Sequence, residues 1–308
     1  MNLQIGVDGG GTKTELILVD SAGTIVASHL APGCNPSQCG PEKARTILLD
    51  SLQALRSKLP AGSVQNTLLF MAGSPAFWAG FAATLTGYGR VVAAPDSIPV
   101  LELATSGAPG LVLHAGTGSF VAARAPDGSI HYAGGLGWKL GDAGSGFDLG
   151  RRAIAQALLE LQGWAQPSGL GDALKIHTGL SDYTANSRFF YNDPTAHAAI
   201  AGFAPRVLTL AAQGCHPAQT QLTEVLAELV SLARLVTAKL FGVSTVPCGV
   251  SGPILDNEAA GFALKALVAT HRWPVTLNFI TTPPIEGVRR LLACPAGTGR
   301  VSPSLGDG

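Results

Sequence analysis

The hydrophobic positions in the first part of the chain form short runs separated by polar or glycine-rich turns, a pattern typical of β-strands. Three such runs predict strands at residues 3–8, 14–20 and 24–31. The turns between them are expected at Gly9–Gly11 and Ser21–Gly23. The chain therefore begins with a predicted meander of three strands.

Helices and strands then alternate. The apolar spacing, with proline at several predicted helix starts, indicates a helix at 41–58, a strand at 64–71, a helix at 75–85, a strand at 90–94 and a helix that begins at Asp96. Aspartate is a good helix N-cap, so capping alone is one interpretation of Asp96.

From residue 111 the same order begins again. Strands are predicted at 111–115, 120–124 and 129–133, and a turn of glycine and threonine at Gly116–Ser119 separates the first two. A unit of strand, turn, strand and strand that occurs twice indicates one architecture used twice.

The remainder of the chain is predicted to be mostly helical. Helices are expected at 147–161, 194–212, 217–240, 257–270 and 285–292, with strands at 246–250 and 275–280. The tail from Cys294 is rich in glycine, proline and serine, and we expect it to be loose.

The composition is that of a soluble enzyme of about two domains. Of the 308 residues 46% are apolar, and 20 basic side chains balance 20 acidic ones. A chain without net charge has no field that favours nucleic acid or an acidic membrane surface. No apolar run approaches the ~20 residues that span a bilayer, and no signal peptide is recognised. We therefore expect a cytoplasmic protein that binds neither nucleic acid nor membrane.

The cysteines and histidines do not indicate a metal site. The five cysteines, at positions 34, 39, 215, 248 and 294, lack the spacing of a zinc site, and the seven histidines are scattered. We expect reduced thiols and assign no ligand role to any histidine.

The most informative motif is the segment Ile5–Thr14. An apolar strand ends in the carboxylate Asp8, which is followed by Gly9, Gly10, Gly11 and Thr12. Glycine permits sharp turns with positive φ and lets backbone N–H groups approach a ligand, while threonine adds a hydroxyl donor. A carboxylate can hold Mg²⁺ directly or through water. Together these residues predict a clasp for the phosphates of ATP.

Two other phosphate-binding motifs do not match this segment. In a Walker A loop the lysine directly follows the second glycine, whereas Thr12 follows Gly11 and Lys13 comes one place late. The Rossmann fingerprint lacks its third glycine, because Thr14 stands there. A glycine-rich hairpin that holds no phosphate remains the alternative.

Three segments in this order carry a family resemblance: Asp8–Thr12, Gly116–Ser119 and Gly135–Ser145, the last with Trp138 and Asp142. They resemble the N-acetylglucosamine kinase branch of the sugar kinase/heat-shock chaperone/actin superfamily, which is grouped with the BadF/BadG/BcrA/BcrD ATPases. The resemblance runs from residue 3 to about residue 290.

This resemblance implies an α/β fold of two ribonuclease H-like (actin-like ATPase) domains around a central nucleotide and sugar cleft. The N-terminal domain, on the sugar side, would comprise residues 1–105 and a returning helix at 283–300. The C-terminal domain, on the nucleotide side, would comprise residues 106–282. A homodimer is also expected from the family.

The implied activity is phosphoryl transfer from Mg²⁺·ATP to a small amino sugar, most simply N-acetylglucosamine to its 6-phosphate. Asp8 would hold Mg²⁺, and Asp96, at the end of a strand, would be the general base. Nucleotide contacts are implied for Gly9, Gly10, Gly11, Thr12, Gly116, Thr117, Gly118, Gly249, Ser251 and Gly252. Sugar contacts are implied for Asn35, Asp96, Trp138 and Asp142.

Each implied site residue also has a structural interpretation. Asn35 could be a turn residue before proline, Trp138 could simply pack, and the turn Gly249–Gly252 could be an ordinary connection from strand to helix.

Because of two departures from the family pattern, the identity of the sugar substrate is not determined by the resemblance. Many members carry glutamate where this chain has Ala143, and some carry asparagine where it has Phe120. Both positions lie near the expected sugar pocket, so glucosamine or another hexose is an alternative substrate. The phosphoryl-transfer residues are not affected.

Two other classes of protein stay open. An ATPase that activates an acyl-CoA dehydratase or reductase would hold an iron–sulfur cluster through cysteines, and Cys34 and Cys39 lie elsewhere than the expected ligands. A sugar sensor would keep the fold without the chemistry. The clustered cysteines of the zinc-containing ROK sugar kinases are absent.

Overall fold

The computed structural model describes residues 2–58, 63–193 and 195–293. The chain divides into two compact units. The first unit contains the described residues of Met1–Gly110, Arg124–His131 and Ile280–Gly308, and the second contains Leu111–Ala123 and Tyr132–Phe279.

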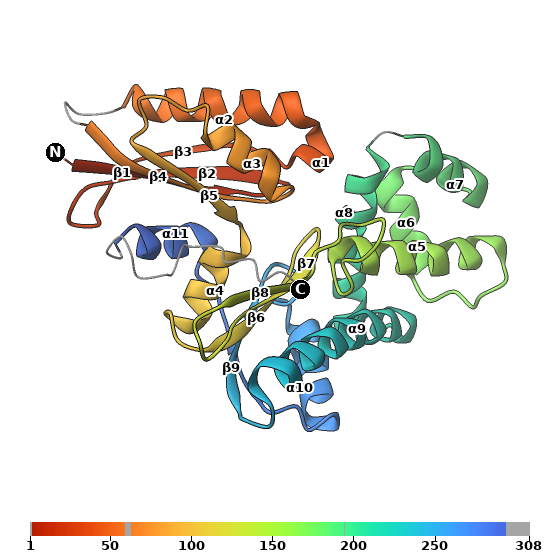
Figure 1. The fold of residues 1–308 in the computed structure, drawn as a ribbon. Coiled ribbons are helices and arrows are strands. Elements are labelled where there is room, and N and C mark those ends of the chain that lie inside the picture. Colours follow the sequence, from red (N-terminus) through yellow and green to blue (C-terminus); the bar gives the residue numbers. More distant parts are fainter. Residues whose placement is uncertain (1, 59–62, 194, 294–308) are drawn as a thin grey trace. The chain divides into compact units, whose positions relative to one another are not determined.

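The first unit is built on a mixed sheet of five strands in the order β3-β2-β1-β4-β5 (Figure 1). These strands are β1 (Asn2–Gly9), β2 (Lys13–Val19), β3 (Ile25–Pro32), β4 (Ser63–Met71) and β5 (Arg90–Pro95). β1, β2 and β3 form an antiparallel meander, whereas β4 and β5 run parallel to β1. The carboxyl ends of β1, β4 and β5 therefore lie at one edge of the sheet.

Helices cover both faces of this sheet. Its helices are α1 (Pro36–Cys39), α2 (Pro41–Arg56), α3 (Pro75–Ala82), α4 (Ser97–Thr105) and α11 (Pro284–Leu292). Leu16 and Leu18 of β2 pack in one core with α2 and α3, while Ile17 and Val19 pack with α4 and α11 in the other. Successive side chains of a strand point to opposite faces, so the alternating apolar residues of β2 serve both cores.

The second unit repeats the strand order of the first. Its strands are β6 (Gly110–Ala115), β7 (Ser119–Arg124), β8 (Ile130–Gly134), β9 (Val246–Ser251) and β10 (Val275–Phe279). They are ordered β10-β9-β6-β7-β8, which read from β8 is the order of the first sheet. β9 runs parallel to both β6 and β10. The expectation of one architecture used twice, and with it the α/β fold class of two ribonuclease H-like domains, is confirmed.

Most of the helical content lies in the second unit. Its helices are α5 (Gly146–Gln162), α6 (Leu170–Thr178), α7 (Tyr183–Asn192), α8 (Ala196–Ala212), α9 (His216–Phe241) and α10 (Glu258–Thr270). α5, α8, α9 and α10 share one hydrophobic core with Leu111, Leu113 and Val250 of the sheet.

Three helices were not predicted from the sequence. α1 has only four residues, and α6 has nine between the glycines Gly169 and Gly179. Within the ten residues of α7 Asn186 is buried, and Phe190 packs partly buried against the core of the second unit.

The expected returning helix is present as α11, which ends at Leu292. Its predicted extension to residue 300, and the tail from Cys294, lie outside the described residues. Among the residues that the structure describes, no helix has the length and apolar character needed to cross a membrane.

Candidate functional site

The first glycine turn connects β1 to β2, directly after Asp8. It is held to the chain that follows β3 by backbone hydrogen bonds. The Cys34 N–H donates to the Gly10 carbonyl (3.1 Å), and the Gly33 N–H donates to the Thr12 carbonyl (3.1 Å). Gly11 and Thr12, at the tip, are exposed. A ligand in solvent can therefore reach the turn.

The glycines of this turn provide space rather than an unusual φ. The expectation of positive φ is wrong for Gly9–Gly11, because none of the three lies in the left-handed region. A Cβ atom at Gly9 would lie 2.4 Å from Met71 Cε, and one at Gly33 would lie 2.0 Å from the Gly11 carbonyl oxygen. Real Cβ atoms do not approach so closely. The contact at Gly33 is with backbone atoms, so this position needs glycine, whereas Met71 Cε at Gly9 is the end of a flexible side chain that can shift.

Two acidic side chains stand at the same edge of the first sheet. Asp8 is the penultimate residue of β1, and Asp96 directly follows β5. Their strands lie on either side of β4, and Asp8, Phe70 and Ala94 are in register across the three. Asp96 therefore comes two residues beyond the row that contains Asp8.

Both carboxyl groups are shifted toward the protonated form. Burial, and to a lesser degree the charge of Asp96, raises the pKa of Asp8 to about 7. Burial raises the pKa of Asp96 to about 6, although nearby backbone amides oppose the rise. Across the described residues, no ion pair to a basic side chain involves either group. Two carboxyl groups with raised pKa values at one place are typical of a site that binds a cation or transfers a proton.

The interpretation of Asp96 as a helix cap is wrong. Asp96 occupies the N-cap position of α4, but its backbone is already helical (φ −63°, ψ −14°) and its side chain makes no capping hydrogen bond. A capping residue has an extended backbone and accepts from an amide of the first turn. The Asp96 carboxylate therefore makes no capping hydrogen bond, and the backbone amides of Asp96 and Ser97 lower its pKa.

Asn35 lies between β3 and α1 and has a structural role. It caps α1, because its Oδ1 accepts from the Ser37 N–H (3.0 Å). The Cβ position of Gly73, which has φ +96°, lies 2.7 Å from the same oxygen. Of the two polar atoms of the Asn35 side chain, Nδ2 makes no hydrogen bond within the described part of the chain. A ligand contact of this side chain would therefore use the Nδ2 donor.

The second glycine turn, Gly116–Ser119, belongs to the second unit and connects β6 to β7. The chain that begins α5 binds it: the Gly146 N–H donates to the Gly116 carbonyl (2.7 Å), and the Phe147 N–H to the Thr117 carbonyl (3.3 Å). The Ser119 hydroxyl donates to the Ala143 carbonyl (2.7 Å). The turn and the segment 142–147 are thus one hydrogen-bonded structure.

Asp142 lies against this turn. The Cβ position of Gly118 is 2.9 Å from Asp142 Oδ2, and Asp142 Oδ1 accepts from the Gly137 N–H (3.2 Å). Asp142 has φ +64°, one of three positive values outside glycine in the described chain. Burial raises the pKa of its carboxyl, which the Gly137 N–H opposes. A residue held in the left-handed region beside a glycine turn marks a candidate site.

Asp148, which the sequence did not single out, supports the Asp142 segment. Its carboxylate accepts from the Gly144 N–H (3.4 Å) and pairs with Arg151 (3.1 Å) and Arg152 (2.9 Å). Arg152 also pairs with Glu228 (2.7 Å). The signal available in the sequence was an aspartate one turn before two arginines.

Trp138 is part of an aromatic cluster with Phe147 and His197, the last also missed from the sequence. The Trp138 and Phe147 rings are 5.4 Å apart, and the His197 ring stacks on Phe147 at 4.9 Å. Trp138 keeps 43% of its surface exposed. Packing alone does not bury this side chain, although the Lys139 ammonium lies 5.2 Å from the ring centroid, so part of the indole remains open to solvent.

The late glycine turn follows β9. Gly249 and Ser251 are strand residues, and Gly252, with φ +98°, leaves the strand. A Cβ at Gly252 would lie 2.4 Å from the Ala115 carbonyl oxygen, so this turn packs on the end of β6. The Ser251 side chain is buried beside His114, with Oγ 3.2 Å from Nδ1.

The two family departures also lie in the second unit. Ala143 contributes its carbonyl to the bond with Ser119. Phe120 is buried, and its ring stacks between those of His114 and Tyr132.

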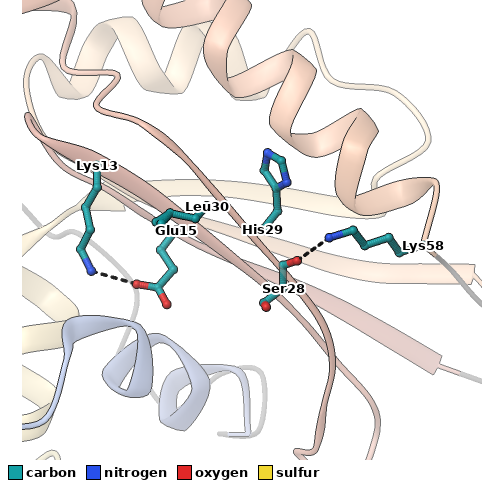
Figure 2. A pocket seen from close by; sticks show the side chains of 6 residues that line it. All are labelled: Lys13, Glu15, Ser28, His29, Leu30 and Lys58. Atoms are coloured by element: carbon teal, nitrogen blue, oxygen red, sulfur yellow. Dashed lines mark hydrogen bonds and ion pairs between the residues drawn. The ribbon is translucent and has the colours of Figure 1, made fainter.

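A hollow of about 380 Å³ lies at the open edge of the first sheet, lined by Lys13, Glu15, Ser28, His29, Leu30 and Lys58 (Figure 2). Figure 2 shows that Lys13 points to Glu15 (3.0 Å) and that Lys58 donates to the Ser28 carbonyl (2.8 Å). The hollow contains none of the residues implied to bind nucleotide or sugar. Lys13 pairs along its own strand.

No metal cluster is found where the structure describes the chain. No three histidine, cysteine or acidic side chains are grouped to hold an ion there, and Cys34, Cys39, Cys215 and Cys248 are free thiols. Burial raises the pKa of Cys34 to about 11 and also raises that of Cys248, so neither is a reactive thiolate.

The chain resembles two characterised sugar kinases. It is 24% identical over 200 residues to the N-acetylmuramic acid/N-acetylglucosamine kinase of Clostridium acetobutylicum, which covers 61% of this chain and 65% of that protein. It is 29% identical over 170 residues to the N-acetyl-D-glucosamine kinase of Dictyostelium discoideum, which covers 50% of this chain and 53% of that one. The matches therefore span less than two thirds of either relative.

A solved structure matches over nearly the whole chain. It is that of a candidate N-acetylglucosamine kinase from Chromobacterium violaceum, with a TM-score of 0.77 and 28% identity over 95% of this chain and 99% of that one. Residues 5–288 match the family model of the BadF/BadG/BcrA/BcrD ATPases, and the chain belongs to this ATPase family.

Proposed function

We propose that this protein is an ATP-dependent kinase of a small amino sugar, with N-acetylglucosamine as the first candidate. The observation that carries the proposal is the pair of carboxyl groups, buried Asp8 and partly exposed Asp96, at one edge of a sheet beside an exposed glycine turn. The family and the printed activities of the two relatives support ATP and an amino sugar as substrates.

Asp96 is the proposed general base. In phosphoryl transfer the sugar hydroxyl oxygen attacks the γ-phosphorus, the bond from phosphorus to the ADP oxygen breaks, and the hydroxyl proton leaves. A carboxylate at the end of a strand that makes no capping bond can accept this proton. With a pKa of about 6, Asp96 is ionised at neutral pH yet more basic than an exposed aspartate.

Asp8 is the proposed ligand for Mg²⁺. The residues present fit a hard cation: Asp8 supplies carboxylate oxygens, and the charge of Asp96 raises its pKa. When bound, Mg²⁺ neutralises charge on the phosphates of ATP. The backbone and hydroxyl donors of Gly9–Thr12 would bind the phosphates beside it.

The second unit supplies the proposed remaining contacts. Gly116, Thr117 and Gly118 would bind phosphate, and Gly249 and Gly252 would approach the nucleoside through their backbone. Ser251 would contribute only its backbone, because its hydroxyl is turned to His114. Trp138 and Asp142 would bind the sugar, together with the amide of Asn35 in the first unit.

The test is ADP release in a coupled assay with Mg²⁺·ATP. The panel contains N-acetylglucosamine, glucosamine, N-acetylmannosamine, N-acetylmuramic acid, glucose and no sugar. We expect turnover with one amino sugar and at least about a 100-fold loss of kcat in Asp96→Asn, because a general base contributes 10²–10⁴ in rate.

The matched control is Asp50→Asn, the same change at an exposed position of α2. It should keep wild-type turnover. Sugar-independent ATP hydrolysis of equal rate in all samples, or full activity of Asp96→Asn, would refute the proposal. The ranking of sugars decides whether Ala143 and Phe120 have moved the preference from N-acetylglucosamine.

A further inference from the structure

His114 lies where the two glycine turns of the second unit come closest. It is the penultimate residue of β6, which leads into Gly116, and it is in register with Ser251 on β9, which leads into Gly252. β6 and β9 are parallel neighbours, so both turns leave the sheet at the same edge.

Several contacts join these strand ends. The Ile254 N–H donates to the Ala115 carbonyl (3.1 Å), and Gly252 packs on that same carbonyl. The His114 ring adds the side-chain link: Nδ1 lies 3.2 Å from Ser251 Oγ, and Nε2 lies 3.5 Å from the Cβ position of Gly116. One imidazole therefore contacts Ser251 at the end of β9 and lies beside Gly116 at the start of the other turn.

The ring cannot leave this place easily. It stacks on Phe120 with 4.9 Å between centroids and 17° between planes, and Phe120 in turn stacks on Tyr132 at 5.4 Å. Burial lowers the pKa of His114 to about 4, so the ring is neutral at working pH. A neutral imidazole carries one donor and one acceptor, which suits a single hydroxyl partner at Nδ1.

We propose that His114 is a positioning residue for the nucleotide: together with Ser251 it sets the spacing between the Gly116–Gly118 turn and the Ser251–Gly252 turn, so that one nucleotide is held by both. This inference rests on the proposed function, since it assigns these turns to ATP. His114 is assigned no contact of its own with the phosphates or the sugar. Its contribution is preorganisation, which raises affinity by reducing the ordering cost of binding.

The experiment measures the Kd of Mg²⁺·ADP by titration calorimetry, together with the KM values for ATP and for the active sugar. In His114→Leu we expect the Kd of Mg²⁺·ADP and the KM for ATP to rise at least about 10-fold, while the KM for the sugar stays within about twofold. His114→Asn, whose side-chain amide can reach Ser251 Oγ, should recover part of the affinity.

Ser251→Ala removes one oxygen from the other side of the same contact and should weaken Mg²⁺·ADP in the same direction. The double variant His114→Leu/Ser251→Ala should be no weaker than the worse single variant, because one interaction is lost in all three. The control is His216→Leu, the same change at the exposed start of α9, and it should bind as the wild type does.

An unchanged Kd for Mg²⁺·ADP in His114→Leu overturns the inference, as does an equal rise of both KM values. If His114→Leu does not fold, the Kd of Mg²⁺·ADP for Ser251→Ala tests the inference instead, and an unchanged value overturns it. A wild type that binds Mg²⁺·ADP without any sugar turnover would refute the proposed function alone, because the nucleotide Kd still tests His114. A wild type that binds no nucleotide would overturn both.

Discussion

Asp8, near the end of β1, and Asp96, directly after β5, lie at the same edge of the first sheet on either side of β4, and the charge of Asp96 helps to raise the pKa of Asp8. Two acidic groups with raised pKa values at one sheet edge cost folding free energy when both are ionised. A bound cation or a proton in transfer would compensate this charge, as the proposed chemistry requires.

The pH dependence of the reaction tests the base. The carboxyl of Asp96 must lose its proton to act as a base, so kcat/KM for the sugar should rise with pH and level off above about 6 when Mg²⁺ is saturating. Below this value the rate should fall about tenfold per pH unit. The residual activity of Asp96→Asn should lack the same acid limb, whereas a flat wild-type profile down to pH 5 would exclude the assignment.

The stability of Asp8→Asn tests the electrostatic cost of the site. Asp8 binds its proton more tightly in the folded chain, with a pKa near 7 against 3.8, so its favourable contribution to folding is present below pH 4 and is lost as pH rises to about 7. Without nucleotide, Asp8→Asn should therefore be more stable than the wild type at pH 8, by at most about 4 kcal/mol.

Thermal melts at pH 5 and pH 8 measure this effect, and the gain should shrink at pH 5. The same variant should lose the stabilisation that Mg²⁺·ADP gives the wild type. Asp50→Asn, exposed on α2, should show neither change. An Asp8→Asn protein less stable than the wild type at pH 8 would mean that Asp8 is satisfied without a ligand.

The close approach of Gly33 to the first glycine turn predicts a severe effect of one methyl group. Gly33→Ala would place Cβ 2.0 Å from the Gly11 carbonyl oxygen, so the turn must move. We expect a loss of more than about 2 kcal/mol in stability and a large rise in the KM for ATP. Gly80→Ala in α3, where no atom lies within 4 Å, should be neutral or stabilise by up to about 1 kcal/mol. Denaturant titration measures the free energy of unfolding of both variants. Equal stability of Gly33→Ala and Gly80→Ala would contradict the close contact at Gly33.

The exposed ring of Trp138 predicts a contribution to sugar binding. Trp138→Ala should raise the KM for the sugar about 10-fold, since an aromatic contact is worth about 1 kcal/mol or more, while the KM for ATP changes little. Trp138→Phe should retain most of the affinity. The control is Trp164→Ala, because Trp164 is 84% exposed and lies outside the site. If Trp138→Ala has the sugar KM of the wild type, Trp138 does not bind the sugar and its role is packing.

The strands of both sheets could be predicted from the sequence because their signal is local. Apolar runs bounded by glycine or proline identified β1 to β10, and the order of these runs was enough to indicate the repeat. The family resemblance rested on contiguous motifs for the same reason, and it is confirmed. The helices α6 and α7, nine and ten residues long, were not predicted.

Contacts between distant segments could not be predicted. His114 and Ser251 are 137 positions apart, and Gly33 meets Gly11 only because β2 and β3 return to the first turn. The same holds for His197, which reaches Phe147 from α8.

The sequence by itself determined the strands of each half in their order along the chain, the two glycine turns, and the acidic residues near the end of β1 and directly after β5, because hydrophobic period and turn residues act over a few positions. Only the tertiary structure decided that Asp96 does not cap its helix, that the first turn needs space rather than positive φ, and that His114 joins two turns. These depend on burial and on the distance between atoms of remote residues, and neither is encoded in local spacing.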